Sequence, residues 1–319
     1  PILTIVVVIF FDMKVDGLLL ANASAHIIIS ILIGIYIKIW RFFDFHFYKF
    51  VKIREMVLYS FPLIPNRIAL VIMSIADRII IISFLDFAAA GIYAVANKLA
   101  TVIGVIYSFF GIAWQETAAR VVKNEYSKDL YNNLFFTTYY FLASILIWVL
   151  TIVPYIFYFF IDVKFFKAMN YIPLLFLSAY FYCLAIFLGG ILTAHKDTVA
   201  IGYTSISAVI TNIILGIFLI GKFGVYGVSF ANCVANFIMF QHRKIYVNKY
   251  IKLDKCNITI INLLIVIFVI GAYYWKNQYL NFCSFFLATL YLVFILKELG
   301  FMVIIQQKMY DFYLRKIHK

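Results

Sequence analysis

The sequence predicts an all-α polytopic membrane protein with about ten transmembrane helices. Hydrophobic residues make up 66% of the 319 residues and charged residues only 13%, and the mean hydropathy is +1.00. A soluble domain has a far more polar surface than this composition allows. Apolar runs of about 20 residues recur along the chain, and lipid permits only helices or closed barrels to span it. The runs are continuous rather than alternating, which favours helices.

The apolar runs give the following spans in chain order: 1–11, 17–40, 56–85, 89–115, 130–160, 168–193, 199–221, 225–246, 257–275 and 279–305. The very short connections at 86–89 and 222–224 predict antiparallel helical hairpins. The first run is short and begins on Pro1, so we expect a fragment whose amino-terminal part is missing.

Basic residues divide unevenly between the two sides of this topology. Loops on one side carry 19 Lys and Arg residues, and loops on the other side carry 5. The positive-inside rule makes the richer side cytoplasmic, so both ends of the chain should face the cytoplasm. The same asymmetry accounts for the formal net charge of +13, and it implies no nucleic-acid partner.

A repeat suggests the domain organisation. Residues 15–25, VDGLLLANASA, and residues 225–235, VYGVSFANCVA, match at five of eleven positions. Chance similarity among apolar helices is the alternative. A real repeat has a period of six helices and predicts two bundles related by an axis along the membrane normal, as in some transporters. The predicted parts are the last two helices of a first bundle (1–40), a second six-helix bundle (56–246), a terminal helix pair (257–305) and a cytoplasmic tail (306–319), in an intact protein of about fourteen spans.

Three cations lie outside the loops, in the hairpin formed by the third and fourth spans: Arg67, Arg78 and Lys98. At 100° per residue, Arg78 falls within about 20° of Arg67, and Ser60 and Ser74 share that face. A polar stripe is costly in lipid, so it should face protein or a water-filled cavity.

The fourth span carries a face of small and polar residues, which permits close helix packing. Its members are Asn97, Thr101, Gly104, Ser108, Gly111 and Gln115. Lys98 lies at the edge of this face. Glu116, after the predicted end of the span, is interpreted as a solvated interfacial residue or as a titratable gate.

The charges of this hairpin have two interpretations. Asp77, Arg78 and Lys98 could form a satisfied cluster that only fixes helix register, and Asp77 could also pair with a group on another helix. However, three cations and one nearby carboxylate leave buried positive charge without a partner, which is unfavourable. A mobile anion would remove this imbalance. Arg67, Arg78 and Lys98 are therefore candidates for the lining of a cationic cavity, and Asp77 and Glu116 for ion coupling or charge pairing.

Residues 62–118 contain PLIPN, DRIIIISFL, GIYAVANK and AWQ in this order. The segment resembles bacterial polysaccharide exporters of the oligosaccharide flippase family, including O-antigen flippases, in the multidrug/oligosaccharidyl-lipid/polysaccharide exporter superfamily. The resemblance implies a multi-pass protein of the bacterial inner membrane that translocates a lipid-linked oligosaccharide of the undecaprenyl-pyrophosphate type. Membrane lipids and polysaccharide assembly proteins are the expected partners.

Other functions predict other features. A multidrug exporter of the same superfamily would favour carboxylates in its cavity, and a transport-inactive membrane protein also remains open. A polysaccharide polymerase or glycosyltransferase would need a long outer loop or a clustered acidic site, which the sequence lacks, so no enzyme activity is expected. No cofactor or metal is expected either, because the cysteines show no paired spacing.

Overall fold

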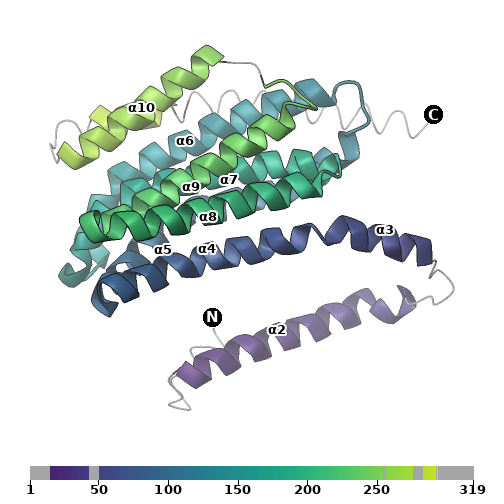
Figure 1. Ribbon diagram of the computed structural model, residues 1–319, viewed down its shortest axis with the longest axis horizontal. Coiled ribbons are helices and arrows are strands. Elements are labelled where there is room, and N and C mark those ends of the chain that lie inside the picture. Colours follow the sequence, from purple (N-terminus) through teal and green to yellow (C-terminus); the bar gives the residue numbers. More distant parts are fainter. Residues whose placement is uncertain (1–14, 43–49, 254–255, 276–282, 292, 294–319) are drawn as a thin grey trace. The chain divides into compact units, whose positions relative to one another are not determined.

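The computed structural model describes residues 15–42, 50–253, 256–275, 283–291 and 293. All regular elements within these residues are helices, which confirms the predicted all-α fold (Figure 1). The chain divides into two compact units, Pro1–Val57 and Leu58–Lys319. The predicted span 1–11 and most of the predicted span 279–305 lie outside the described residues.

The first unit contains α2 (Val15–Ile37), followed by the short 3-10 helix η1 (Ile39–Phe42). Both repeat segments are helical, residues 15–25 in α2 and residues 225–235 in α9 (Val225–Val247). The repeat and the six-helix organisation inferred from it stay predictions.

The predicted span 56–85 is split into α3 (Phe50–Ser60) and α4 (Leu63–Phe84). The break lies at Phe61 and Pro62. Proline has no N–H to donate within a helix, but it is tolerated in the first turn, where the N–H groups have no intrahelical acceptor. Pro62 therefore precedes α4 and Pro65 falls in its first turn.

After α4, seven further labelled helical elements follow in the described part of the second unit. They are α5 (Phe87–Val121), α6 (Ser127–Phe160), the 3-10 helix η3 (Val163–Asn170), α7 (Ile172–Ala194), α8 (Thr198–Phe223), α9 and α10 (Cys256–Trp275). Within the described residues, α5, α6, α7 and α8 are long and apolar enough to cross a membrane. Helix α5 continues past the predicted end of its span at residue 115.

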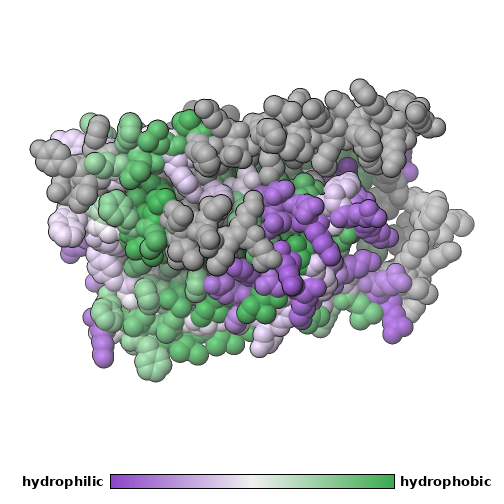
Figure 2. All heavy atoms as spheres, turned by 90° about the horizontal axis from the view of Figure 1, so that it is seen from above, coloured by the Kyte–Doolittle hydropathy of each residue, from purple (hydrophilic) through white to green (hydrophobic). Residues whose placement is uncertain are grey.

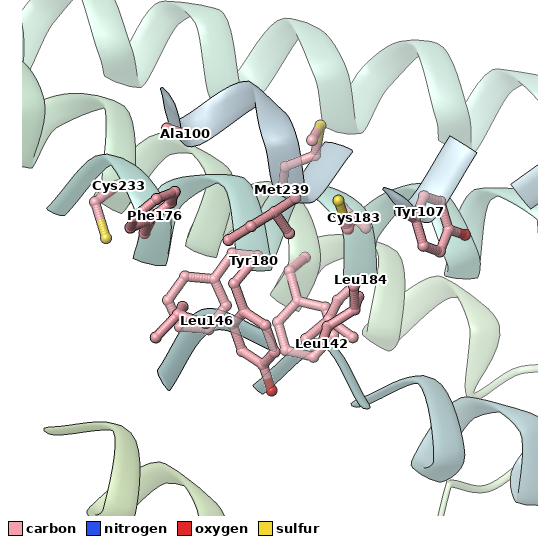
Figure 3. Close-up of a cluster of buried hydrophobic side chains, with 14 of the residues drawn as sticks. Ala100, Tyr107, Leu142, Leu146, Phe176, Tyr180, Cys183, Leu184, Cys233 and Met239 are labelled. Atoms are coloured by element: carbon pink, nitrogen blue, oxygen red, sulfur yellow. The ribbon is translucent and has the colours of Figure 1, made fainter. Parts of the chain in front are cut away.

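Helix α7 lies at the centre of this unit and packs against α5, α6 and α9. Figure 3 shows the resulting hydrophobic cluster, in which Phe176, Tyr180 and Leu184 of α7 lie near Leu142 and Leu146 of α6. Lipid tails are as apolar as these side chains, so the helices are held by close packing and by polar contacts rather than by escape from water. Voids and displaced polar groups should therefore be costly here.

Two tight turns form the hairpins. Leu85 and Asp86 separate α4 from α5, and the Asp86 carboxylate accepts a hydrogen bond from the Ala89 N–H at 2.6 Å, which caps α5. The observed connection of two residues is thus shorter than the predicted connection, residues 86–89. Gly224 alone separates α8 from α9, with φ of 56°, a conformation that favours glycine.

The opposite ends of the second unit differ in polarity. Figure 2 shows hydrophobic side chains over the left-hand and lower parts of one face and hydrophilic side chains toward the right. At the end where α6 begins and α9 ends, a polar pocket is lined by Lys128, Asp129, Asn132 and residues 248–252. Tyr250 in this pocket donates a hydrogen bond of 3.1 Å to Asp197, the residue that caps α8.

The α8–α9 hairpin yields a test of close packing. A Cβ at Gly227 would lie 2.6 Å from the Leu219 carbonyl oxygen, a backbone atom that cannot move without separating the helices. We expect Gly227→Ala to lower the free energy of unfolding by about 1–3 kcal/mol, the usual cost of overpacking. Denaturation of the purified protein in detergent measures this change.

Gly221→Ala is the matched control, because a Cβ at Gly221 would meet no atom within 4 Å. It should leave stability unchanged or raise it slightly through the helix propensity of alanine. Equal stability losses in the two variants would contradict the role of close approach at Gly227.

Candidate functional site

The second unit contains a cavity of about 850 Å³ between α4, α5, α7 and α9. Its charged lining residues are Arg67, Asp77 and Arg243. The rest of the wall combines amides and hydroxyls with apolar side chains, which is the composition expected of a ligand pocket.

Helix α5 supplies one wall of the cavity. All six residues of its predicted small and polar face line the cavity: Asn97, Thr101, Gly104, Ser108, Gly111 and Gln115. The Thr101 hydroxyl donates to the Lys98 carbonyl at 2.6 Å, and the Ser108 hydroxyl donates to the Val105 carbonyl at 2.7 Å. These local bonds satisfy the hydroxyl protons without a partner from another helix, so the wall can remain open.

Helix α4 brings only part of its predicted stripe to the cavity. Arg67 and Ser74 line the cavity, whereas Ser60 and Arg78 are exposed and lie outside its lining. Lys98 of α5 is also exposed and outside the lining. The structure therefore does not bring Arg67, Arg78 and Lys98 together around this cavity.

The helical geometry explains this difference. The inward face of α4 has its centre about 60° from Arg67, as the mean direction of all the lining residues of this helix. These residues are Leu63, Asn66, Arg67, Leu70, Met73, Ser74 and Asp77. Arg78 lies about 20° from Arg67 in the opposite direction and is therefore about 80° from that centre. Arg67 is at the edge of the inward face, and a small further rotation places Arg78 outside it.

Asp77 is the buried carboxylate of the cavity, with an exposed fraction of 3%. Its Oδ2 accepts hydrogen bonds from the Tyr93 hydroxyl and from Asn232 Nδ2, both at 2.5 Å. Its Oδ1 accepts a hydrogen bond of 3.1 Å from Asn212 Nδ2. Three neutral donors from α5, α8 and α9 thus solvate the carboxylate. Of the pairings left open by the sequence, contact with groups on other helices is the one observed.

A second layer of polar groups continues from this carboxylate into α7. Asn232 Oδ1 accepts hydrogen bonds from the Ser178 hydroxyl at 2.5 Å and from Asn236 Nδ2 at 3.1 Å. Asn236 also donates to the Ser178 hydroxyl oxygen at 2.8 Å. The network orients Asn232, so that its amide nitrogen points to Asp77.

Arg243 is the second buried charge, with an exposed fraction of 4%. The guanidinium donates to the Ala185 carbonyl at 2.8 Å and to the hydroxyls of Ser205 and Thr204 at 2.9 Å and 3.2 Å. Its Nη2 also lies 3.5 Å from Asn66 Oδ1. All these acceptors are neutral, so the charge is hydrogen-bonded but has no carboxylate partner in the described part of the chain.

The sequence interpretation missed Arg243, because it counted this residue among the 19 basic loop residues although it falls near the end of the predicted span 225–246. The structure places it inside α9, which ends at Val247. A helical signal was present: Asn232, Asn236 and Arg243 fall within about 40° of one another at 100° per residue. This polar stripe resembles the one read in α5.

Glu116 lies outside the cavity. Its side chain is 63% exposed and forms an ion pair with Arg120, one turn further along α5, at 2.5 Å. Exposed pairs of this spacing contribute only about 0.3–0.5 kcal/mol. The structure thus places Glu116 in a local surface contact, remote from the Asp77 network.

Comparison with known proteins bears on the identity of the chain. A family model described as "Polysaccharide biosynthesis protein" matches residues 2–115. The match includes α4 and most of α5, and it confirms the resemblance predicted from residues 62–118. No curated protein sequence matches the chain.

Two solved structures share the fold of this chain. The lipid II flippase MurJ in an inward closed conformation matches with a TM-score of 0.58 and 16% identity over 90% of the present chain and 62% of MurJ. The Vibrio cholerae MATE transporter VcmN in a bent form matches with a TM-score of 0.56 and 18% identity. That match covers 70% of the present chain and 54% of VcmN. The chain thus spans between about half and three fifths of these structures.

The Asp77 network yields a second prediction. Asp77→Ala would leave three buried donors without their acceptor, so we expect the free energy of unfolding to fall by about 3–5 kcal/mol. Arg78→Gln changes an exposed residue of the same helix and should change stability by no more than about 0.5 kcal/mol. Denaturation in detergent measures both. Comparable losses in the two variants would contradict the special role of the Asp77 network.

Proposed function

We propose that the chain is part of a flippase that translocates a polyprenyl-pyrophosphate-linked oligosaccharide across the bacterial inner membrane for surface polysaccharide synthesis. The observation that carries this proposal is the charge of the cavity, where two arginines face one carboxylate that is already bonded to neutral donors. The family match and the fold shared with a lipid II flippase support the same function.

The proposed ligand fits the chemistry of this wall. Arg67 is exposed at the cavity and has no carboxylate partner in the described part of the chain, so its planar guanidinium is free to bind a phosphate oxygen pair. Hydroxyls and amides of α5 suit sugar groups, while the polyprenyl chain would stay in lipid. Binding of the undecaprenyl-pyrophosphate group would neutralise positive charge that is otherwise unpaired.

The other sequence-predicted residues have narrower proposed roles. Arg78 and Lys98 lie outside this cavity and would contact the ligand only in another state of the transporter or on its way in. Asp77 is the proposed group for ion coupling or charge pairing, and Glu116 is the weaker candidate because it is exposed. Membrane lipids and polysaccharide assembly proteins remain the proposed partners, and no nucleic acid is involved.

A multidrug antiporter of the same superfamily is the second candidate, because the MATE transporter shares the fold equally well. Its cationic cargo would require an accessible carboxylate in the cavity. Asp77 is buried and hydrogen-bonded by three donors, which disfavours this function. A transport-inactive membrane protein is the third, and it predicts no translocation at all.

Reconstitution tests the proposed function. We expect proteoliposomes containing the protein to translocate a fluorescent oligosaccharide linked to polyprenyl pyrophosphate, measured as loss of protection from an external quencher. Arg67→Gln should slow translocation at least about tenfold, the effect of losing one charged hydrogen-bond pair. Lys164→Gln is the control, because Lys164 is exposed and pairs with Asp162 at 3.3 Å, away from the cavity. If the protein instead takes up cationic dyes, and if Arg67→Gln leaves this uptake unchanged, the antiporter function would be favoured.

The proposed orientation in the inner membrane gives a separate prediction. A cysteine at Lys196, in the α7–α8 connection, should react with an impermeant maleimide only from the cytoplasm, since basic residues gather on that side. A cysteine at Phe223, beside the α8–α9 turn, should react only from outside. Cys256 and the exposed Cys283 are replaced by serine beforehand, whereas Cys183 and Cys233 are buried and should not react. Labelling of both positions from one side would overturn the topology.

A further inference from the structure

We propose that Arg243 and Tyr107 form the inner end of a phosphoryl-binding site in the cavity, with Arg67 at its accessible end. The inference rests on the proposed function and identifies where the charged group of the ligand would bind. Neither Arg243 nor Tyr107 was selected from the sequence.

Arg243 has a donor left over after its structural contacts. Its Nε, Nη1 and Nη2 supply four contacts to Thr204, Ala185, Ser205 and Asn66. A guanidinium has five N–H groups, so one N–H on Nη1 lacks an acceptor among the described residues. A buried cation with a free N–H favours an anionic acceptor strongly, because charged hydrogen bonds are about twice as strong as neutral ones.

The α7 backbone is built to receive this guanidinium. A Cβ at Gly189, which also lines the cavity, would lie 2.9 Å from Arg243 Nη1. Any larger side chain at this position would thus displace the guanidinium from the Ala185 carbonyl or fill the space beside it. The absence of a side chain leaves Nη1 next to the cavity.

Tyr107 of α5 provides a second unused donor at the cavity. Its side chain is 4% exposed, and its hydroxyl has no hydrogen-bond partner among the described residues. Figure 3 shows the Tyr107 ring beside Cys183, with its hydroxyl pointing away from the hydrophobic cluster. Tyr107 and Arg243 both line the cavity. A buried hydroxyl without a partner costs about 1–3 kcal/mol, which a bound acceptor would remove.

Arg67 connects this inner end to the accessible part of the cavity. Arg67 is exposed and lines the same cavity as the buried Arg243. The carboxylate of Asp77 is engaged with its own three donors and does not pair with either arginine. A phosphate or pyrophosphate group is therefore the ligand class that matches two guanidiniums and one phenolic donor.

Titration calorimetry on the purified chain in nanodiscs tests the site, with farnesyl pyrophosphate and inorganic pyrophosphate as probes and farnesol as the uncharged control. Tyr107→Phe removes one hydroxyl and should weaken pyrophosphate binding about tenfold. Arg243→Lys retains the charge but loses the planar fork, and should weaken binding at least as much. Because Arg243→Lys also alters contacts between helices, Tyr107→Phe is the decisive variant.

Tyr140→Phe is the matched control. Its hydroxyl is also buried without a hydrogen-bond partner among the described residues, but Tyr140 belongs to α6 and does not line the cavity. Its removal should leave binding unchanged. Tighter binding of farnesyl pyrophosphate than of inorganic pyrophosphate would identify a lipid headgroup site, and equal binding would identify a site for free phosphates.

The outcomes separate the two proposals. Wild-type binding of farnesyl pyrophosphate that is weakened by Arg67→Gln but not by Tyr107→Phe or Arg243→Lys would overturn the inner site and leave the flippase proposal standing. Absence of binding to the wild-type protein by either pyrophosphate would overturn both proposals. An equal loss in Tyr107→Phe and Tyr140→Phe would also reject the inner site, because the effect would then not depend on the cavity.

Discussion

The buried carboxylate of Asp77 is the constraint on which the second unit depends. A carboxylate inside a membrane protein is costly unless it is bonded or neutralised. Helix α4 carries this charge, and the donors Tyr93, Asn212 and Asn232 come from α5, α8 and α9. The four helices must therefore meet at one depth and in one rotational setting. The single-residue turn at Gly224 makes this possible by holding α8 and α9 in register.

Arg243 imposes a complementary constraint with a different set of helices. Its guanidinium joins α9 to α7, α8 and α4 through neutral acceptors, including Asn66 in the first turn of α4. Asn66 lies directly after the helix break at Pro62, and it also accepts a hydrogen bond of 2.5 Å from Ser205. The two charges thus fix α4 at separate points. The small residues of α5 between these points need no partner from α4, and this leaves room for the cavity.

The sequence predicted most of the described helices and the polar wall of α5, because both depend on local patterns. Apolar run length locates a helix, and a spacing of three and four residues identifies one of its faces. It did not predict which cations face the cavity, because this depends on the rotation of α4 against its neighbours. Only about 20° around the helix axis separates Arg67 from Arg78. Arg243 was missed because an arginine near a helix end satisfies the positive-inside rule whether it is exposed or buried.

The hydrogen-bond partners of each charge, rather than the number of charges, decide which cargo the cavity favours. Both oxygens of Asp77 already accept hydrogen bonds, so a cation entering the cavity would have to compete with three well-placed neutral donors. Arg243 and Tyr107 instead retain donors without acceptors among the described residues. In a low-dielectric interior an unsatisfied donor destabilises the protein, and an anion that accepts its hydrogen bond on binding removes this free-energy cost. The carboxylate that positions the helices is therefore a poor cation site. The electrostatic potential in the cavity is then set by its arginines, and it favours an anion.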